Sequence, residues 1–197
     1  MQRICVFCGS SSGSSPEYEI AARELGLLLA ERKIALVYGG SNIGLMGALA
    51  DAVLEAGGHA IGVIPQSLVD REVAHTGLSD LRIAGSMHER KALMADLADG
   101  FIAMPGGYGT FDELCEILTW AQLGIHGKPV GLLNILGYWD PFLHFLDHAV
   151  HAGFLKPRHR ELVNVGENAV ELLDRLQWLE QSAPQPAQSK WNRPELR

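Results

Sequence analysis

The segment FIAMPGGYGT at residues 101–110 joins a short apolar run to a glycine-rich loop. The apolar run at 101–104 predicts a buried strand, and the pattern after it predicts a helix from about Thr110 to Leu123. Glycines let the backbone approach a ligand closely, and a helix start offers unpaired N–H groups that suit a phosphate. This segment therefore indicates a nucleotide-type loop, with a tight turn that holds no ligand as the alternative.

The order of strand, glycine-rich loop and helix occurs twice earlier in the chain. Residues 4–8, ICVFC, lead into GSSSGSS at 9–15, and a helix is predicted from Pro16 to about Arg32 with Ser15 as its N-cap. Residues 35–38, ALVY, lead into GGSNIG at 39–44 and a helix that ends at Gly57 and Gly58. Further strands are predicted at 60–64, 81–84, 129–133 and 162–165, and further helices at 87–98, about 142–150 and 169–179.

This alternation predicts an α/β fold, a Rossmann-like three-layer sandwich with a mostly parallel sheet covered by helices on both faces. Ligands of such sheets bind at the carboxyl ends of the strands, at the switch point of the strand order. We therefore expect the three glycine-rich loops to meet at one crevice. Residues 1–180 are predicted to form a single nucleotide-binding catalytic domain, and the polar, proline-rich residues 181–197 a flexible C-terminal tail.

The composition is that of a globular protein and argues against several classes. The chain has 197 residues, 22 glycines and 47% hydrophobic residues, and no apolar run is long enough for a transmembrane helix. The chain has a net charge of −7, whereas nucleic-acid binders typically carry a basic surface. We expect neither a membrane nor a nucleic acid as partner. The N-terminus reads as no signal peptide, and Cys5, Cys8 and Cys115 read as reduced thiols, so a cytoplasmic location is expected.

The sequence opposes the familiar cofactor and metal chemistries. It has no GxxxxGK[ST] loop, and the first strand ends in GSSSG rather than GxGxxG, so P-loop hydrolysis and hydride transfer are poorly supported. His144, His148 and His151 share one helix face and could form a zinc site with Asp140 or Asp147. A polar flank beside the apolar stripe of that helix is the favoured interpretation, and no metal or cofactor is expected.

Two charged segments lie close to the third glycine-rich loop. Glu113 is expected on the first turn of the helix, where it either compensates the helix dipole or faces a bound sugar. Arg90 and Lys91 are expected near the start of the helix at 87–98, where positive charge opposes the dipole. That misfit favours a role in neutralising a phosphate or a developing negative charge over a solvated helix start. Ser10 is read as either a ligand contact or a turn residue.

Four segments together resemble the LONELY GUY family of cytokinin-activating phosphoribohydrolases, formerly often labelled lysine decarboxylases. They are VYGGSNIGLMG at 37–47, MHERK at 87–91, PGGYGTFDE at 105–113 and TWAQLGIHGKPVGLLN at 119–134, and the resemblance spans about residues 3–180. It implies hydrolysis of the N-glycosidic bond of cytokinin riboside 5′-monophosphates, with AMP as a further substrate. It also implies a homodimer or higher assembly whose active sites draw on the dimer surface. An AMP nucleosidase of purine salvage and a non-catalytic nucleotide sensor remain alternatives.

The resemblance implies that Arg90 and Glu113 are the catalytic residues. A carboxylate beside the ribose can stabilise an oxocarbenium-like sugar and orient or deprotonate water, and an arginine can offset charge on the departing base. Met87, Met94 and Trp120 are candidates for the wall that contacts a substituent on the base. The predicted substrate-binding positions are Gly9, Ser10, Gly39, Gly40, Glu72, Arg90, Lys91, Gly106, Gly107, Tyr108, Gly109, Thr110 and Thr119.

Overall fold

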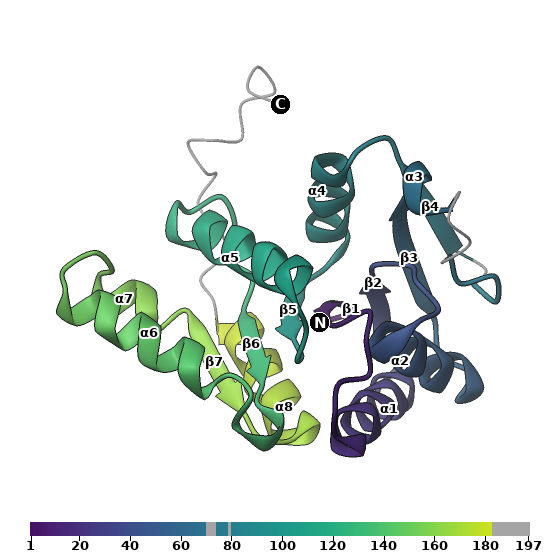
Figure 1. Cartoon of the computed structure of the whole chain (residues 1–197), viewed down its shortest axis with the longest axis horizontal. Coiled ribbons are helices and arrows are strands. Elements are labelled where there is room, and N and C mark those ends of the chain that lie inside the picture. The colour runs from purple at the N-terminus through teal and green to yellow at the C-terminus, as the bar shows by residue number, and fades with distance from the viewer. Residues whose placement is uncertain (70–73, 79, 183–197) are drawn as a thin grey trace.

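The computed structural model describes residues 1–69, 74–78 and 80–182 of the chain (Figure 1). Within them one seven-stranded sheet contains β1 (Arg3–Phe7), β2 (Ala35–Tyr38), β3 (Ala60–Pro65), β4 (Asp80–Ala84), β5 (Gly100–Ala103), β6 (Val130–Leu133) and β7 (Val163–Gly166). The helices are α1 (Pro16–Glu31), α2 (Gly44–Glu55), α3 (Gln66–Val69), α4 (Met87–Leu97), α5 (Tyr108–Gln122), the 3-10 helix η1 (Ile135–Gly137), α6 (Asp140–His151), α7 (Pro157–Arg160) and α8 (Ala169–Ser182).

The described strands are all parallel and lie in the order β4-β3-β2-β1-β5-β6-β7. The chain builds outward from β1 to β4 and then returns to place β5 on the other side of β1 (Figure 1). This confirms the predicted α/β sandwich. It also places the switch point between β1 and β5, where the first and third glycine-rich loops leave the sheet.

Alternating side chains of the strands build a core on each face of the sheet. From β1, Ile4 and Val6 join the core under α1, α2 and α8, whereas Cys5 and Phe7 join the core under α4, α5 and α6. Cys8 lies on the opposite face from Cys5, as the strand period requires, and both are free and buried. Burial, and to a lesser extent the charge of Glu113, raises the pKa of both thiols, so they stay protonated.

Backbone contacts tie the three glycine-rich loops together at the carboxyl edge of the sheet. The Gly9 N–H donates to the Pro105 carbonyl at 3.0 Å, and the Leu45 N–H donates to the Gly9 carbonyl at 3.1 Å. Gly44 has a φ of +59° and lies so close to the Ser10 carbonyl group that a Cβ there would overlap it. Glycine at this position therefore meets both a conformational and a steric requirement.

The structure differs from the prediction mainly at short elements and at one helix start. α5 begins at Tyr108 rather than Thr110, because Gly107 is its N-cap and Gly109 is accommodated in the first turn. α3, η1 and α7 were not predicted, since segments of three or four residues are too short to show a period. Most of the expected tail, residues 183–197, lies outside the described residues. In the described part, no helix has the length and apolar character that a membrane crossing needs.

Candidate active site

A cavity of about 230 Å³ opens at the switch point between β1 and β5. Nine of the predicted site residues line it: Gly9, Ser10, Gly39, Arg90, Gly107, Tyr108, Gly109, Thr110 and Glu113. They come from all three glycine-rich loops and from α4 and α5. The structure thus brings together segments that are far apart in the sequence, as the topology predicts.

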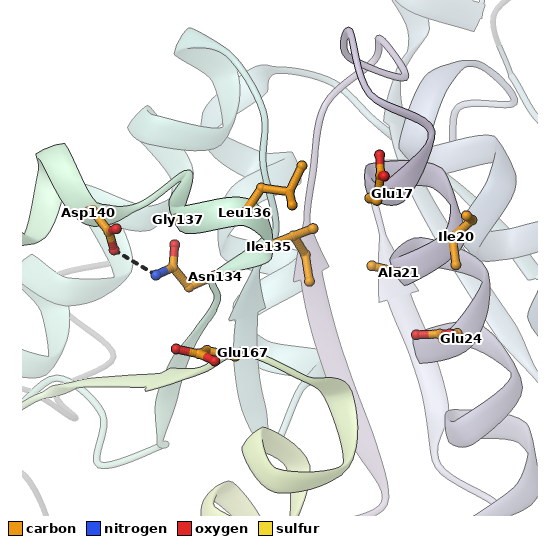
Figure 2. A pocket seen from close by; sticks show the side chains of 10 residues that line it. All are labelled: Glu17, Ile20, Ala21, Glu24, Asn134, Ile135, Leu136, Gly137, Asp140 and Glu167. Carbon is orange, nitrogen blue, oxygen red and sulfur yellow. Dashed lines mark hydrogen bonds between the residues drawn. The ribbon is translucent and has the colours of Figure 1, made fainter.

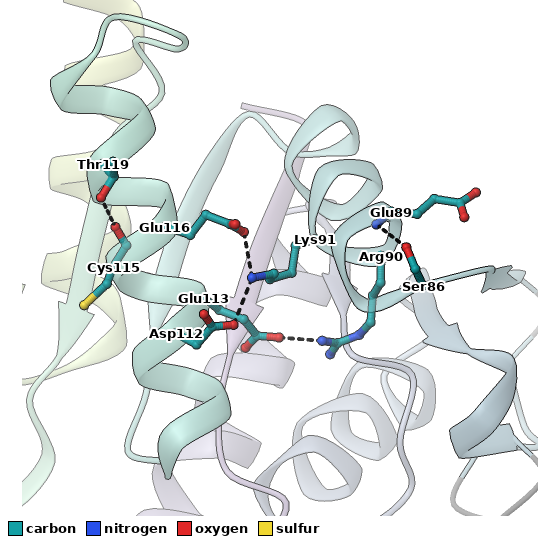
Figure 3. Close-up of polar contacts among 9 residues, drawn as sticks. All are labelled: Ser86, Glu89, Arg90, Lys91, Asp112, Glu113, Cys115, Glu116 and Thr119. Atoms are coloured by element: carbon teal, nitrogen blue, oxygen red, sulfur yellow. Dashed lines mark hydrogen bonds and ion pairs between the residues drawn. The ribbon is translucent and has the colours of Figure 1, made fainter. Parts of the chain in front are cut away.

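The start of α4 is fixed by a variant of the capping box, in which the glutamate bonds to the residue before the N-cap Ser86. The Glu89 N–H donates to the Ser86 hydroxyl oxygen at 3.1 Å, and the Glu89 carboxylate accepts from the Gly85 N–H at 2.8 Å. This reciprocal pattern of a serine and a glutamate three residues later defines where the helix begins. It therefore also fixes the position of Arg90, the next residue, on the inward face of α4 (Figure 3).

Arg90 and Glu113 form a buried ion pair at the inner end of the cavity. Arg90 Nη1 lies 2.7 Å from Glu113 Oε1, and each residue keeps only 7% of its surface exposed (Figure 3). Arg90 Nε donates to the Val63 carbonyl at 3.0 Å. Because α5 starts earlier than predicted, Glu113 lies on its second turn, so the expectation of a first-turn position is wrong. Its carboxylate accepts from Arg90 across to α4 instead of capping α5.

The surroundings of Glu113 favour its neutral form more than water does. Burial raises the pKa of Glu113 above its ordinary value, and the charge and hydrogen bond of Arg90 offset that effect only in part. A buried carboxyl group with a raised pKa and one cationic partner is typical of a group that exchanges protons or stabilises charge. The pair is therefore the strongest candidate for chemistry among the described residues.

Lys91 does not line the cavity, although the sequence places it beside Arg90. Its ammonium group lies 2.9 Å from the Asp112 carboxylate and 3.2 Å from the Glu116 carboxylate on α5 (Figure 3). Burial alone would lower the pKa of Lys91, but these two hydrogen-bonded carboxylates raise it above its ordinary value. In this structure, Lys91 joins α4 to α5 next to the catalytic candidates.

The start of α5 has the character of an anion site. Gly107 is its N-cap without a side-chain hydrogen bond, and no acidic residue lies in the first turn. By contrast, α1 carries Glu17 and Glu19 in its first turn. The positive end of the α5 dipole therefore has no carboxylate to compensate it, and its first N–H groups are placed beside the cavity. Thr110, buried beside Gly106, belongs to the same turn.

Three other predicted positions do not line this cavity, and the structure does not describe a fourth. Gly106 packs against Thr110 and Gly9, and its carbonyl accepts a hydrogen bond from the Tyr138 hydroxyl. Gly40 has a φ of +74° and faces Ile64. The Thr119 hydroxyl donates to the Cys115 carbonyl at 2.7 Å on the exposed side of α5. Glu72 lies outside the described residues.

Sequence reasoning missed several residues that line the cavity. Met46 at the start of α2 contributes to its wall, as do Val6, Phe7 and Cys8 at the carboxyl end of β1. Of the three candidates for a substituent wall, Met87 lines the cavity, whereas Met94 and Trp120 belong to the core under α4, α5 and α6. Met46 follows a glycine-rich loop by two residues, a position that resembled an ordinary helix residue in the sequence.

A larger cavity of about 550 Å³ lies further along the same edge of the sheet, between α1 and the segment that joins β6 to α6 (Figure 2). Its carboxylates belong to Glu17, Glu24, Asp140 and Glu167, and all four residues are exposed. The Asp140 carboxylate accepts from the Asn134 amide at 2.8 Å. None of the predicted site residues lines this larger cavity.

The fold and the cavity at its switch point define a Rossmann-like α/β protein with a candidate nucleotide site built around a buried Arg–Glu pair. A family model described as possible lysine decarboxylase matches residues 46–176. The chain is 53% identical over 176 residues to the cytokinin riboside 5′-monophosphate phosphoribohydrolase LOG7 of Arabidopsis thaliana, covering 89% of this chain and 81% of that protein. It is 54% identical to the enzyme LOG of Oryza sativa subsp. japonica, covering 89% and 73%. The chain belongs to this family, the LONELY GUY family that its motifs predict.

Solved structures of more distant proteins share the fold. A molybdenum cofactor binding protein from Rippkaea orientalis has a TM-score of 0.68 at 23% identity, covering 90% of this chain and 96% of that chain. The Moco carrier protein of Chlamydomonas reinhardtii has a TM-score of 0.68 at 23% identity, covering 92% and 98%. At this identity the likeness concerns the arrangement of the backbone, and it carries nothing about the ligand.

Proposed function

We propose that this chain hydrolyses the N-glycosidic bond of cytokinin riboside 5′-monophosphates, releasing the free base and ribose 5-phosphate. The observation that carries the proposal is the buried Arg90–Glu113 pair beside the uncompensated start of α5. The curated relatives with more than half of their aligned residues identical are named for this activity. The description of the matching family mentions a lysine decarboxylase. Lys91, the lysine next to Arg90, gives no support to that activity, because it is paired with Asp112 and Glu116 and does not line the cavity.

The proposed reaction breaks the bond between C1′ of the ribose and the base nitrogen. The electron pair of that bond leaves with the base, and the sugar acquires oxocarbenium character. The Glu113 carboxylate stabilises this positive charge and orients a water molecule for attack on C1′. The water supplies hydroxyl to C1′, and its other proton is transferred, through Glu113, to the departing base, so that atoms and charge balance. Arg90 holds the base side of the nucleotide and offsets the negative charge that develops there.

The phosphate of the nucleotide is assigned to the start of α5. Backbone N–H groups of Gly107, Gly109 and Thr110 would anchor it, with the helix dipole favouring the negative charge. Such a site would let a chain with a net charge of −7 bind an anion, since the local field rather than the net charge decides affinity.

The apolar part of the cavity favours a nucleotide with a substituent on its base. Met46 and Met87 are flexible thioether side chains in the wall of the cavity, which Val6 and Phe7 also line. The decisive measurement compares product formation from isopentenyladenosine 5′-monophosphate and AMP. We expect base release from both with a higher kcat/KM for the prenylated nucleotide. A strong preference for AMP would instead favour an AMP nucleosidase, and binding without base release would favour a nucleotide sensor.

We further propose that the chain acts as a homodimer or higher assembly. Several large apolar side chains stay exposed on the face of the molecule that α5 and α6 cover, including Leu123, Ile125 and Phe145. Thr119 lies on the exposed side of α5, away from the cavity of its own chain, which fits a contribution to the site of a second copy. Light scattering should give a dimer or larger mass for the wild type, and Phe145→Glu should lower it. A monomeric wild type would contradict the proposal.

We also propose a cytoplasmic location. The cysteines at 5, 8 and 115 are free in the structure, which is the usual state in a reducing compartment. Fractionation of cells that express the full chain tests this proposal, and recovery in a secreted fraction would contradict it.

A further inference from the structure

Gly39 follows the last residue of β2 and lies against the guanidinium group of Arg90. A Cβ placed on Gly39 would overlap Arg90 Nη2 and would lie 2.9 Å from the Met46 sulfur. Gly39 does not have a positive φ, so its backbone conformation is open to any residue. The reason for glycine at this position is therefore space rather than conformation.

The guanidinium group has little freedom to give way while its contacts hold. Nε donates to the Val63 carbonyl at 3.0 Å, and Nη1 donates to Glu113 at 2.7 Å. Because the guanidinium is planar and rigid, these two anchored nitrogens fix the third. Nη2 therefore lies in the space that the missing side chain of Gly39 leaves open.

Other loop glycines are required for different reasons. Gly40 and Gly44 have φ values of +74° and +59°, and a Cβ on Gly9 would meet backbone atoms of Ser11 and Gly106. Among all the glycines, Gly39 alone would direct a Cβ into Arg90. Since the obstructed atom is the end of a long side chain, an added methyl group displaces Arg90 more readily than it disrupts the fold.

We propose that Gly39 is a positioning residue that keeps the Arg90 guanidinium on Glu113. Gly39 affects the reaction only through its contact with Arg90 and performs no chemistry of its own. The expected effect of Gly39 on turnover rests on the proposed function. The expected effect of Gly39 on the geometry of the Arg90–Glu113 pair does not rest on it. The two can therefore fail separately.

The first test compares Gly39→Ala with Gly127→Ala, because Gly127 has nothing within 4 Å of a built Cβ and no positive φ. The titration of Glu113 is followed by the ¹³C carboxyl shift in the protein without ligand. Since Arg90 lowers the pKa of Glu113, displacing Arg90 in Gly39→Ala should raise that pKa, and Gly127→Ala should leave it unchanged. An unchanged Glu113 titration in folded Gly39→Ala would overturn the proposal, whatever the enzyme activity.

The second test separates displacement of Arg90 from direct obstruction of the substrate. Misplacing a catalytic group by about 1 Å can cost about 10²-fold, so Gly39→Ala should lower kcat on that scale with a smaller effect on KM. In an Arg90→Lys background, the same change should add less than about twofold, since lysine lacks the obstructed nitrogen. An equally large loss in both backgrounds, with a raised KM, would indicate obstruction and contradict the proposal.

The close approach to Met46 provides a control for folding. If Gly39→Ala lowers the melting temperature of the wild type, it should lower that of Met46→Ala by less, because the other contact is then absent. The pKa of Glu113 should remain raised in this double variant, because Arg90 Nη2 is still obstructed. Recovery of the wild-type titration together with the smaller loss of melting temperature would assign the effect to packing and overturn the role of Gly39.

Discussion

Two cavities open at the same edge of the sheet, and the proposed chemistry belongs to the smaller one. The larger, about 550 Å³, contains four exposed carboxylates, whereas the smaller, about 230 Å³, contains a buried arginine and a buried glutamate 2.7 Å apart. Exposed carboxylates remain in contact with solvent, which screens their interactions with other charges. Burial changes both the pKa of Glu113 and the strength of its interactions, so volume is a poor guide to the site here.

Glu113→Gln is the strongest test of the difference between the two cavities. Glutamine keeps the size of the side chain and removes the charge and the proton-accepting group, so kcat should fall about 10²- to 10⁴-fold with nucleotide binding retained. The matched control is Glu167→Gln in the larger cavity, which should stay within twofold of the wild type. Base release from the nucleotide and the dissociation constant are measured for both variants. Full turnover in Glu113→Gln with unchanged binding would remove Glu113 from the mechanism.

Arg90→Lys tests whether the geometry of the buried cation matters as well as its charge. Lysine lacks the planar fork that reaches Val63 and Glu113 together, so kcat/KM should fall about 10²-fold. Arg23→Lys is the control, because Arg23 pairs with Glu55 at 2.6 Å on the surface. It should change neither turnover nor stability measurably. Equal activity of Arg90→Lys and the wild type would show that any positive charge suffices.

The sequence predicts the position of the site better than the way in which its side chains are held. Short apolar strands followed by glycine-rich loops suffice to predict a parallel sheet, and the switch point follows from its topology. Glu113 and Arg90 could be singled out, but the pairing across α4 and α5 depends on helix rotation. A two-residue error at the start of α5 was enough to put Glu113 on the wrong turn.

Lys91 and Gly39 are two positions whose contacts could not be predicted from the local sequence. Lys91 is adjacent to Arg90 in the sequence, but neighbouring residues on a helix point about 100° apart, and Lys91 meets Asp112 and Glu116 instead. Gly39 resembled a phosphate-loop glycine, whereas the structure places Arg90 against it. Both outcomes depend on side chains that are distant in the sequence, which no local pattern encodes.

The pH dependence of kcat/KM should report the raised pKa of the buried Glu113. The proposed reaction needs the carboxylate, so activity should rise with pH as Glu113 loses its proton. Because burial raises the pKa of Glu113, the acid limb should lie above the ordinary glutamate value of about 4.3. Activity should fall about tenfold for each pH unit below that limb. An acid limb at or below the ordinary value would mean that Glu113 is not the group that titrates in catalysis.

The smallest effect is expected for Glu116→Gln, which asks whether an ion pair next to the cavity behaves like the one inside it. Glu116 lies 3.2 Å from Lys91, and Asp112 remains at 2.9 Å as a second partner after the change. Water screens this partly exposed network, so the free energy of unfolding in urea should fall by at most about 1 kcal/mol. Turnover should stay within twofold of the wild type, because Lys91 and Glu116 do not line the cavity. A loss of turnover comparable to that of Glu113→Gln would instead return Lys91 to the substrate site that the sequence predicts, and a place in the cavity wall would no longer separate the catalytic pair from its neighbours.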